Sequence, residues 1–377
     1  MTEPNRRMYE LEYPSPSVKS EGNGQTTLVV ALQGYADAGH AIELASDHLK
    51  AALDSRPLAH FNNDELIDYR SRRPAVTIEH NNITNSEDLT LDMRVLRDPQ
   101  GHSFLLLSGP EPDLRWEAFT QAVADLVEQF DVTNTISLYS APMTVPHTRP
   151  LVVSGHGNAP ELLRRMFGFD SRLIVPGSAS LYLERELHRR GRNVAGYTAQ
   201  VPHYLSASPY PEAALKLLQA VSEASGLKLP LGSLERDAQR IAEQVSDGIS
   251  DNQEIQQIVA ALEQQYDEEI SQYRESHPQA MLPGEPEVPS GEQIGEEFER
   301  FLAGLDQPHQ GSEDHHPPLF ELPEEPPHPP ENHPHYFPED LFKADPQEGR
   351  DPNNTTFEDD PDGSPSPEDE GYNEGPH

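Results

Sequence analysis

The chain contains no cysteine in its 377 residues. This absence excludes disulfide bonds, thiolate metal sites, iron–sulfur clusters and cysteine nucleophiles. Long apolar runs are also missing, because no stretch approaches the ~20 residues that a membrane-spanning helix needs. Residues 1–24 are polar and contain three prolines, which is unlike a secretion signal. We therefore predict a cytoplasmic protein that does not insert into a membrane.

Basic residues are few, with 27 Lys and Arg against 65 Asp and Glu and a formal net charge of −38. Phosphate binding needs a basic surface, so nucleic acid is not an expected partner. Residues 278–377 alone hold 26 acidic residues, three basic residues and 20 of the 37 prolines. Such a segment cannot bury enough apolar area to offset the entropy of ordering its backbone. We expect residues 278–377 to form a disordered, acidic, proline-rich tail.

Apolar runs bounded by glycine or proline alternate with stretches of helical period between residues 27 and 231. This alternation is typical of strands connected by crossover helices. Asp37 and Asp113 each precede a helical stretch and are suited to cap it. We predict a flexible N-terminus at 1–24 and an α/β core over 25–231, with a mostly parallel sheet covered by helices on both faces. The strands are expected at residues 27–33, 104–107, 135–139, 172–175 and 194–197.

Two short segments, residues 76–78 and 89–95, flank an asparagine-rich turn. The pattern predicts an antiparallel β-hairpin inserted at about residues 75–97. A two-stranded hairpin is marginally stable alone, so its apolar face needs a partner surface in this subunit or in a neighbouring one.

The period becomes helical throughout after residue 231. Two amphipathic stretches over residues 232–277, with a break near Gly248, predict a lid-like helical hairpin with one apolar side. Within the tail, Ser290 and Gln293 form a capping box ahead of an apolar stripe, which predicts a short helix at about residues 291–305. Two alternatives stand for this helix: it docks on the body of the protein, or it folds into the groove of a partner.

Five motifs occur in a fixed order along the predicted core. They are LQGYADAG at 32–39, DELIDYR at 64–70, GPEPD at 109–113, PHTRP at 146–150 and VPHY at 201–204. With their surroundings they cover roughly residues 27–231, and together they resemble the second type of the proteasome assembly chaperone family, in its bacterial branch of members without an assigned role.

The resemblance implies a core like that of nucleoside phosphorylases, a hairpin insertion used in self-association as a trimer, and a C-terminal helical piece over a cleft. Some relatives act as proteasome assembly chaperones, and certain of these insert a terminal hydrophobic-Tyr-any tripeptide into proteasome subunits. This chain ends in Gly375-Pro376-His377. We therefore do not expect it to dock on a proteasome through its C-terminus.

In open α/β sheets, ligands bind beyond the carboxyl ends of the strands, and this rule places a set of glycine and polar residues along one rim. No phosphate-loop, dinucleotide-binding, nucleophile-elbow or zinc-protease motif is present, so we predict no cofactor and no metal site and assign no catalytic residue. The candidate ligand-binding residues are Gly34, Tyr35, Asp37, Gly39, Asp68, Arg70, Arg73, Glu111, His147, Arg149, Ser178, His203 and Tyr204.

Each group of candidates has a structural alternative. The glycine-rich turn after residue 33 presents amides to an anion, or it only turns the chain while Asp37 caps a helix. The two arginines at 70 and 73 suit a carboxylate or phosphate group, or they pair with Asp68 within the chain. The two candidate histidines suit general bases near neutral pH, although histidines on loops are more often structural.

We predict a homo-oligomeric binding or scaffold protein, in which the hairpin builds the oligomer and the tail contacts protein partners. The alternative is an enzyme or sensor that acts on a small anionic or nucleoside-like ligand in a cleft covered by the C-terminal helices. An enclosed pocket lined by the charged candidates would favour the enzyme. A shallow rim with each charge paired inside the chain would favour the scaffold.

Overall fold

The computed structural model describes residues 8–18, 25–168, 172–250 and 252–278, together with Pro283 and Glu285. The chain divides into two units, Met1–Gln310 and Gly311–His377, and every described residue belongs to the first. Apart from Pro278, Pro283 and Glu285, the predicted disordered tail lies outside the described residues, and so does its short helix at about 291–305.

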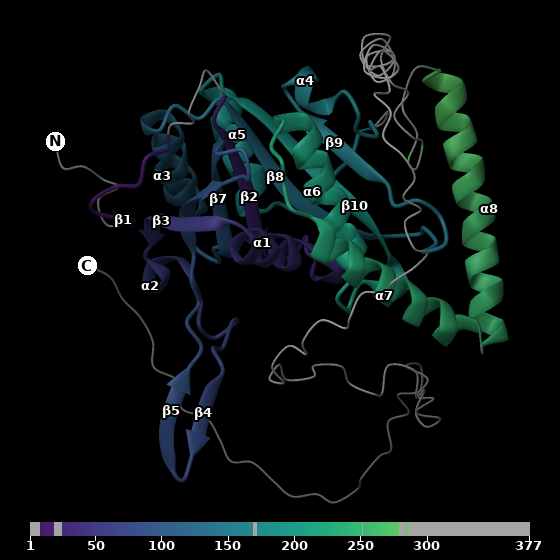
Figure 1. The fold of residues 1–377 in the computed structure, drawn as a ribbon, viewed down its shortest axis with the longest axis horizontal. Helices are drawn as coiled ribbons and strands as arrows, with labels where there is room; N and C mark the ends of the chain where they lie inside the picture. Colours follow the sequence, from purple (N-terminus) through teal and green to yellow (C-terminus); the bar gives the residue numbers. More distant parts are fainter. Residues whose placement is uncertain are drawn as a thin grey trace, which may run out of the picture. The chain divides into compact units, whose positions relative to one another are not determined.

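The centre of the fold is an eight-stranded sheet in the order β1-β3-β6-β7-β2-β8-β10-β9 (Figure 1). Four neighbouring strands at its centre are parallel, as predicted: β7 (Ser103–Pro110), β2 (Thr27–Gln33), β8 (Asn134–Met143) and β10 (Asn193–Pro202). Antiparallel strands extend both edges, and these are β1 (Tyr9–Leu11), β3 (Asp54–Phe61) and β6 (Asp92–Arg97) on one side and β9 (Val153–Gly157) on the other.

Helices cover both faces of this sheet, which confirms the predicted α/β class. The helices α1 (Ala41–Ala52) and α6 (Pro211–Ser225) enclose one apolar layer, and α3 (Trp116–Gln129) and α5 (Ala179–Arg189) enclose the other. In β2, Val29 and Ala31 pack into the first layer while Leu28, Val30 and Leu32 pack into the second. A strand buried on both faces has a continuous apolar run in its sequence, and this is why residues 27–33 could be predicted as a strand. The short elements are η1 (Ala38–His40), α2 (Asn63–Leu66), α4 (Pro160–Leu163) and η2 (His203–Leu205).

The inserted hairpin consists of β4 (Val76–Glu79) and β5 (Asn82–Ser86). Its turn residues His80 and Asn81 have φ of 46° and 67°, which is the backbone of a tight two-residue hairpin loop. All residues of both strands are exposed. The second hairpin strand was expected at 89–95, but that alternating pattern belongs to β6, whose Met93 and Val95 face the core of the main sheet.

The strand predicted at residues 172–175 is absent, and this prediction was wrong. Residues 172–178 have no regular structure, and Leu173, Ile174 and Val175 are 54%, 86% and 60% exposed. The place beside β10 is filled by β9, which pairs with it in antiparallel fashion. The apolar triplet therefore has no sheet position to occupy.

The C-terminal addition contains the two predicted helices, α7 (Gly232–Ser250) and α8 (Gln253–Ser276). The first half of α7 packs on the layer of α1 and α6 through Leu234, Ala238 and Ile241. Figure 1 shows α8 turning away from α7 instead of running back along it, so the pair is not a closed helical hairpin. Neither these nor any other helix in the described part of the chain has the length and apolarity that crossing a membrane requires.

Candidate functional site

The carboxyl ends of β2 and β7 meet the start of α5 at the rim where an anion site was predicted. Glu111, which follows β7, is only 9% exposed, and its Oε1 accepts a hydrogen bond of 2.6 Å from the backbone amide of Ala179. The same carboxylate accepts from the amide of Tyr35, and burial raises its pKa while these amides partly oppose the rise. A Cβ at Gly34 would lie 2.2 Å from Glu111 Oε2. The protein's own carboxylate thus fills the position that a bound anion would take.

The turn after β2 serves the start of α1. Asp37 Oδ1 accepts from the amide of Ile42 at 2.7 Å, and Oδ2 accepts from that of Glu43 at 3.4 Å. Burial raises the pKa of Asp37. Gly39 has φ of 69°, and a Cβ there would lie 2.9 Å from the Cβ of Tyr210. Asp37 therefore caps α1 and the glycine turns the chain, which is the structural alternative for these residues. Ser178 likewise caps α5, since its Oγ accepts from the amide of Leu181 at 3.2 Å.

Three candidates, Asp68, Arg70 and Arg73, lie on the segment that leads into the hairpin, and we call them the Asp68 group. Asp68 Oδ1 accepts from the amide of Arg70 at 3.0 Å and from its Nε at 3.3 Å, and this arginine lowers the pKa of the carboxyl. Arg70 is 86% exposed, and Arg73 is also exposed. Arg72, which sequence reasoning missed, reaches the rim instead: its Nη1 donates to the carbonyl of Gln33 at 3.1 Å.

Asp113 was expected to cap the helix after β7, but it holds the Asp68 segment. Its Oδ2 accepts from the amide of Asp68 at 2.9 Å, and its Oδ1 accepts from Arg72 Nε at 3.3 Å. The helix α3 begins later, at Trp116, after a left-handed Arg115 with φ of 57°. The acidic and basic residues of this segment therefore form internal ion pairs across the sheet edge.

A second group of candidates meets beyond the ends of β8 and β10. His147 Nδ1 lies 2.8 Å from the hydroxyl of Tyr204, which also accepts from the amide of His147 at 2.9 Å. Burial lowers the pKa of His147 and raises that of Tyr204. His203 is exposed and its ring meets Tyr204 edge-on, with 5.3 Å between centroids. The structure thus brings three of the candidates together, with one histidine held by the tyrosine.

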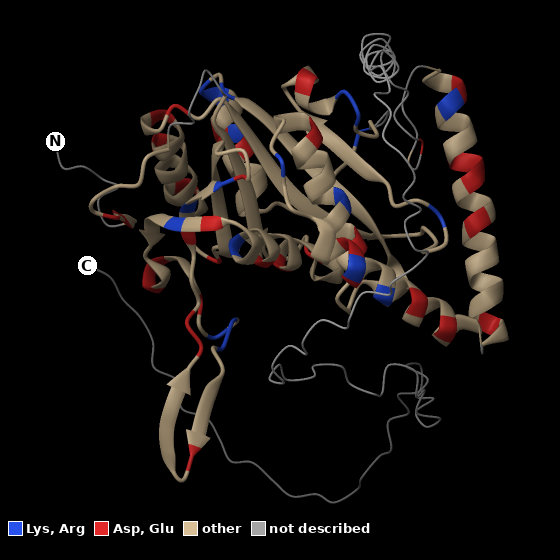
Figure 2. Cartoon of the chain, viewed as in Figure 1, with Lys and Arg blue, Asp and Glu red and all other residues tan. Residues whose placement is uncertain are grey.

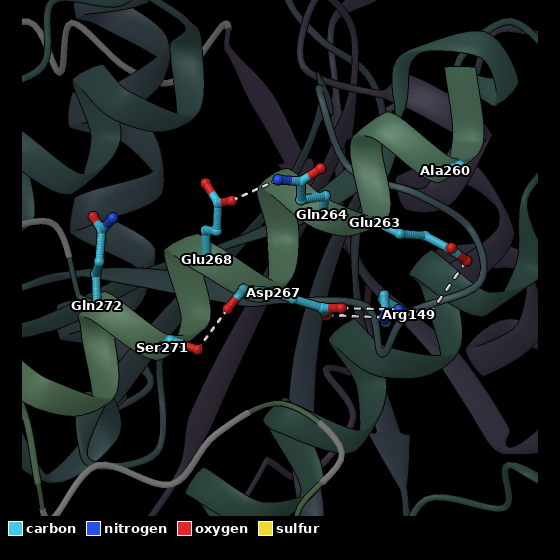
Figure 3. A pocket seen from close by; sticks show the side chains of 8 residues that line it. All are labelled: Arg149, Ala260, Glu263, Gln264, Asp267, Glu268, Ser271 and Gln272. Carbon is cyan, nitrogen blue, oxygen red and sulfur yellow. Dashed lines mark hydrogen bonds and ion pairs between the residues drawn. The ribbon is translucent and has the colours of Figure 1, made fainter. Parts of the chain in front are cut away.

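Arg149 lies on the loop between β8 and β9 and binds to α8 (Figure 3). Its Nε and Nη2 each lie 2.9 Å from a different carboxylate oxygen of Asp267, and its Nη1 lies 3.2 Å from Glu263 Oε1. These acids raise the pKa of Arg149 further above its ordinary value. Tyr266 adds a hydrogen bond of 2.7 Å from its hydroxyl to the carbonyl of Pro150. The arginine fork is therefore already occupied by two carboxylates of the same chain.

An open depression of about 670 Å³ lies along this contact, and Figure 2 shows that acidic residues recur along α7 and α8. Of the candidate residues, Arg149 alone lines the depression. A second gap beside Pro146 and Tyr266 is too small to hold a water molecule. Among the described residues, neither histidine and no member of the Asp68 group lines either of these two hollows. The residues lining the depression are Arg149, Ala260, Glu263, Gln264, Asp267, Glu268, Ser271 and Gln272.

A buried polar cluster of Tyr139, His156 and Glu184 was not predicted from the sequence. Glu184 on α5 is 6% exposed; its Oε1 accepts from the hydroxyl of Tyr139 at 2.7 Å, and its Oε2 lies 2.9 Å from His156 Nε2. Burial raises the pKa of Tyr139 well above its ordinary value, and the hydrogen bond to Glu184 raises that of His156. A Cβ at Gly196 would lie 2.2 Å from the His156 ring. The sequence contained one indication of this cluster, because Glu184 falls on the apolar stripe of its helix beside Leu183 and Leu187, where a charged side chain is expected to be buried.

The contact between His156 and Glu184 predicts how the stability of the protein depends on pH. The folded pKa of His156 is raised, so its stabilising contribution is complete below about pH 6.5, the unperturbed value, and is lost as pH rises through the folded value. We expect the difference in unfolding free energy between the wild type and His156→Gln to shrink from pH 6 to pH 9. Urea unfolding of both proteins measures it, and a difference that is constant across this range would contradict the ion pair.

The fold and the rim together define a class of α/β protein with a hairpin insertion and a helical addition. At the carboxyl ends of its strands, the candidate carboxylates and Arg149 bind to groups of the same chain. The chain belongs to the PAC2 family, because the family model matches residues 31–248. The predicted resemblance to the second type of proteasome assembly chaperones is thereby confirmed.

Solved structures of similar proteins agree with this assignment. A Corynebacterium glutamicum protein of unknown function is 60% identical, with TM-score 0.70, over 71% of this chain and 100% of that one. A Mycobacterium tuberculosis protein of unknown function is 46% identical, with TM-score 0.68, over 71% and 93%. A proteasome-assembly chaperone homologue from M. tuberculosis shares the fold at 24% identity, with TM-score 0.58, over 63% and 99%. A comparison with curated proteins found no match.

Proposed function

We propose that this chain is a cytoplasmic homo-oligomeric scaffold of the assembly-factor type, in which the β4–β5 hairpin joins the copies, as a trimer. One observation carries the proposal. Val76, Ile78 and Ile83 are 52%, 67% and 73% exposed on a two-stranded sheet whose residues are all exposed. A two-stranded sheet is marginal in water unless a further surface covers its apolar face. A neighbouring copy supplies that surface.

The pairing of the rim charges supports a scaffold over an enzyme. Asp68 is bound to Arg70, Arg149 to Asp267, and Glu111 to backbone amides. A ligand would have to displace these partners, which costs most free energy at the buried Glu111 and little at the exposed Asp68–Arg70 pair. The open depression is lined mainly by acidic and amide side chains of α8, which suits neither an anion nor a nucleoside phosphate.

The family resemblance points to protein partners. We infer that the acidic tail contacts them. A basic protein surface is the partner that a tail of such charge would attract, with an association rate that falls as salt is added.

The hairpin provides the test. Ile78 and Ile83 are direct cross-strand neighbours, so replacing both by aspartate puts two charges on the apolar face. We expect Ile78→Asp/Ile83→Asp to convert the oligomer into a monomer, because burying these charges at an interface costs more than the contact supplies. Light scattering after size exclusion measures the mass, and circular dichroism checks that the body remains folded.

The matched control carries the same charges at another cross-strand pair. Thr77 and Asn85 form the next cross-strand pair, beyond a register shift at which β5 carries one extra residue, Thr84. Thr77 directly precedes Ile78 in its strand, so this pair faces the other side of the hairpin. Thr77→Asp/Asn85→Asp is expected to remain oligomeric. A wild type that is monomeric, or an isoleucine double variant that keeps its mass, would refute hairpin-mediated assembly.

A further inference from the structure

A second exposed apolar surface lies on the segment that was expected to be a strand. We call Leu173, Ile174 and Val175 the apolar loop. The three side chains follow one another with exposures of 54%, 86% and 60%. Contiguous exposed apolar groups of this kind mark surfaces that something covers.

Gly168, five positions before the apolar loop, lies beside the C-terminal end of α8. Tyr273, in the last turn of this helix, stacks on Phe167 with 3.8 Å between ring centroids, and its hydroxyl accepts from the amide of Gly168 at 3.1 Å. His277 stacks in turn on Tyr273 at 4.3 Å. Five positions of chain separate Gly168 from Leu173, a span of at most about 18 Å. The chain that leaves α8 therefore starts close to the apolar loop.

We propose that residues 290–305 of the same chain dock on the apolar loop as an amphipathic helix. The sequence of this segment starts with the capping box of Ser290 and Gln293. An isolated helix of this length is marginal in water, so its apolar stripe gains most of its stability from a surface to pack on. The stripe consists of Ile294, Phe298, Phe301, Leu302 and Leu305.

The connection favours this intramolecular occupant over a separate partner. Since α8 ends at Ser276, the chain from 277 to 289 has 13 residues, which reach at most about 45 Å when extended. A tether of this kind holds the segment at an effective concentration on the order of millimolar. A weak apolar contact is then sufficient for occupancy.

The charges are also complementary. The segment 290–305 carries Glu292, Glu296, Glu297 and Glu299 against the single Arg300. On the body, Arg172 adjoins the apolar loop and Arg164 lies on the exposed surface just before Phe167. An acidic helix that packs its apolar stripe on the loop places its carboxylates near these guanidinium groups, which adds an attraction that salt weakens.

The absence of cysteine makes disulfide trapping the direct experiment. In the full chain, Ile174→Cys/Phe301→Cys is oxidised at low micromolar concentration and followed by non-reducing electrophoresis. The control pair Gln100→Cys/Phe301→Cys places the first cysteine on the exposed turn between β6 and β7, at the opposite ends of the strands. We expect the first pair to form an intramolecular disulfide at least tenfold faster than the control.

Equal rates for the two pairs would overturn the proposal, and so would predominantly intermolecular disulfides, which would place the segment on another copy. A second measurement uses Phe301→Asp, a change in the segment that is proposed to dock. Hydrogen exchange at residues 172–178 is expected to accelerate in this variant, and unchanged exchange would also contradict docking. Both readouts are independent of the hairpin, so failure here leaves the scaffold proposal standing.

Discussion

Replacing Gly109 by alanine is expected to destabilise the protein by about 2–6 kcal/mol, the sum of backbone strain and overpacking. Gly109 has φ of 127°, which side chains rarely adopt, and a Cβ there would lie 2.1 Å from the carbonyl oxygen of Thr90. That oxygen belongs to the backbone leading into β6, so it cannot rotate away as a side chain would. Urea unfolding of the wild type and Gly109→Ala measures the loss.

Gly101 supplies the matched control, because it also has a positive φ, of 87°, but a Cβ there would meet no atom within 4 Å. Gly101→Ala carries only the conformational penalty, about 1–2 kcal/mol. If both alanine variants lost the same stability, the close approach of β7 to the chain before β6 would not be the cause.

Truncation of Glu111 is the second large effect. Glu111→Ala leaves a buried cavity and removes the acceptor of the Ala179 and Tyr35 amides, so we expect a loss of about 2–4 kcal/mol. The emptied position is then lined by amides at the start of α5, which suits a small anion. Formate is expected to restore part of the stability in Glu111→Ala, because a ligand of the native state stabilises by mass action.

The control for this rescue is Glu117→Ala, which removes an exposed carboxylate from α3 and is expected to change stability by less than about 0.5 kcal/mol. Thermal unfolding with formate, and with chloride at the same ionic strength, separates anion binding from salt effects. A Glu111→Ala protein that responds equally to both salts would show that the carboxylate does not occupy an anion position.

The elements buried on two faces could be predicted from the sequence, and those at the edges could not. The central strand β2 is apolar at every buried position except Thr27, so its bounds followed directly from the pattern. The strand β3, next to the edge strand β1, has Asp54, Arg56 and Pro57 in its more exposed half, and this composition hides its pairing with β6. For the same reason, an apolar triplet at 173–175 resembled a strand although no sheet edge was open to it.

The candidate residues were partly grouped as expected, but their roles depended on partners that are distant in the chain. Arg149 is bound by Asp267 across 118 positions, and Glu111 by Ala179 across 68. Residue type and spacing indicate that an arginine suits a carboxylate, but they do not show that the carboxylate comes from the same chain. The depression beside Arg149 likewise arises from the path of α8, which its amphipathic pattern does not specify.

Hydrogen exchange of residues 76–86 as a function of protein concentration tests hairpin-mediated assembly most directly. A two-stranded sheet with every residue exposed exchanges rapidly in a monomer, and its amides become protected only when another copy covers it. The scaffold account predicts protection that rises with concentration in the wild type and stays absent in Ile78→Asp/Ile83→Asp. Rapid exchange of the wild-type hairpin at every concentration, including those at which the protein is oligomeric, would contradict it.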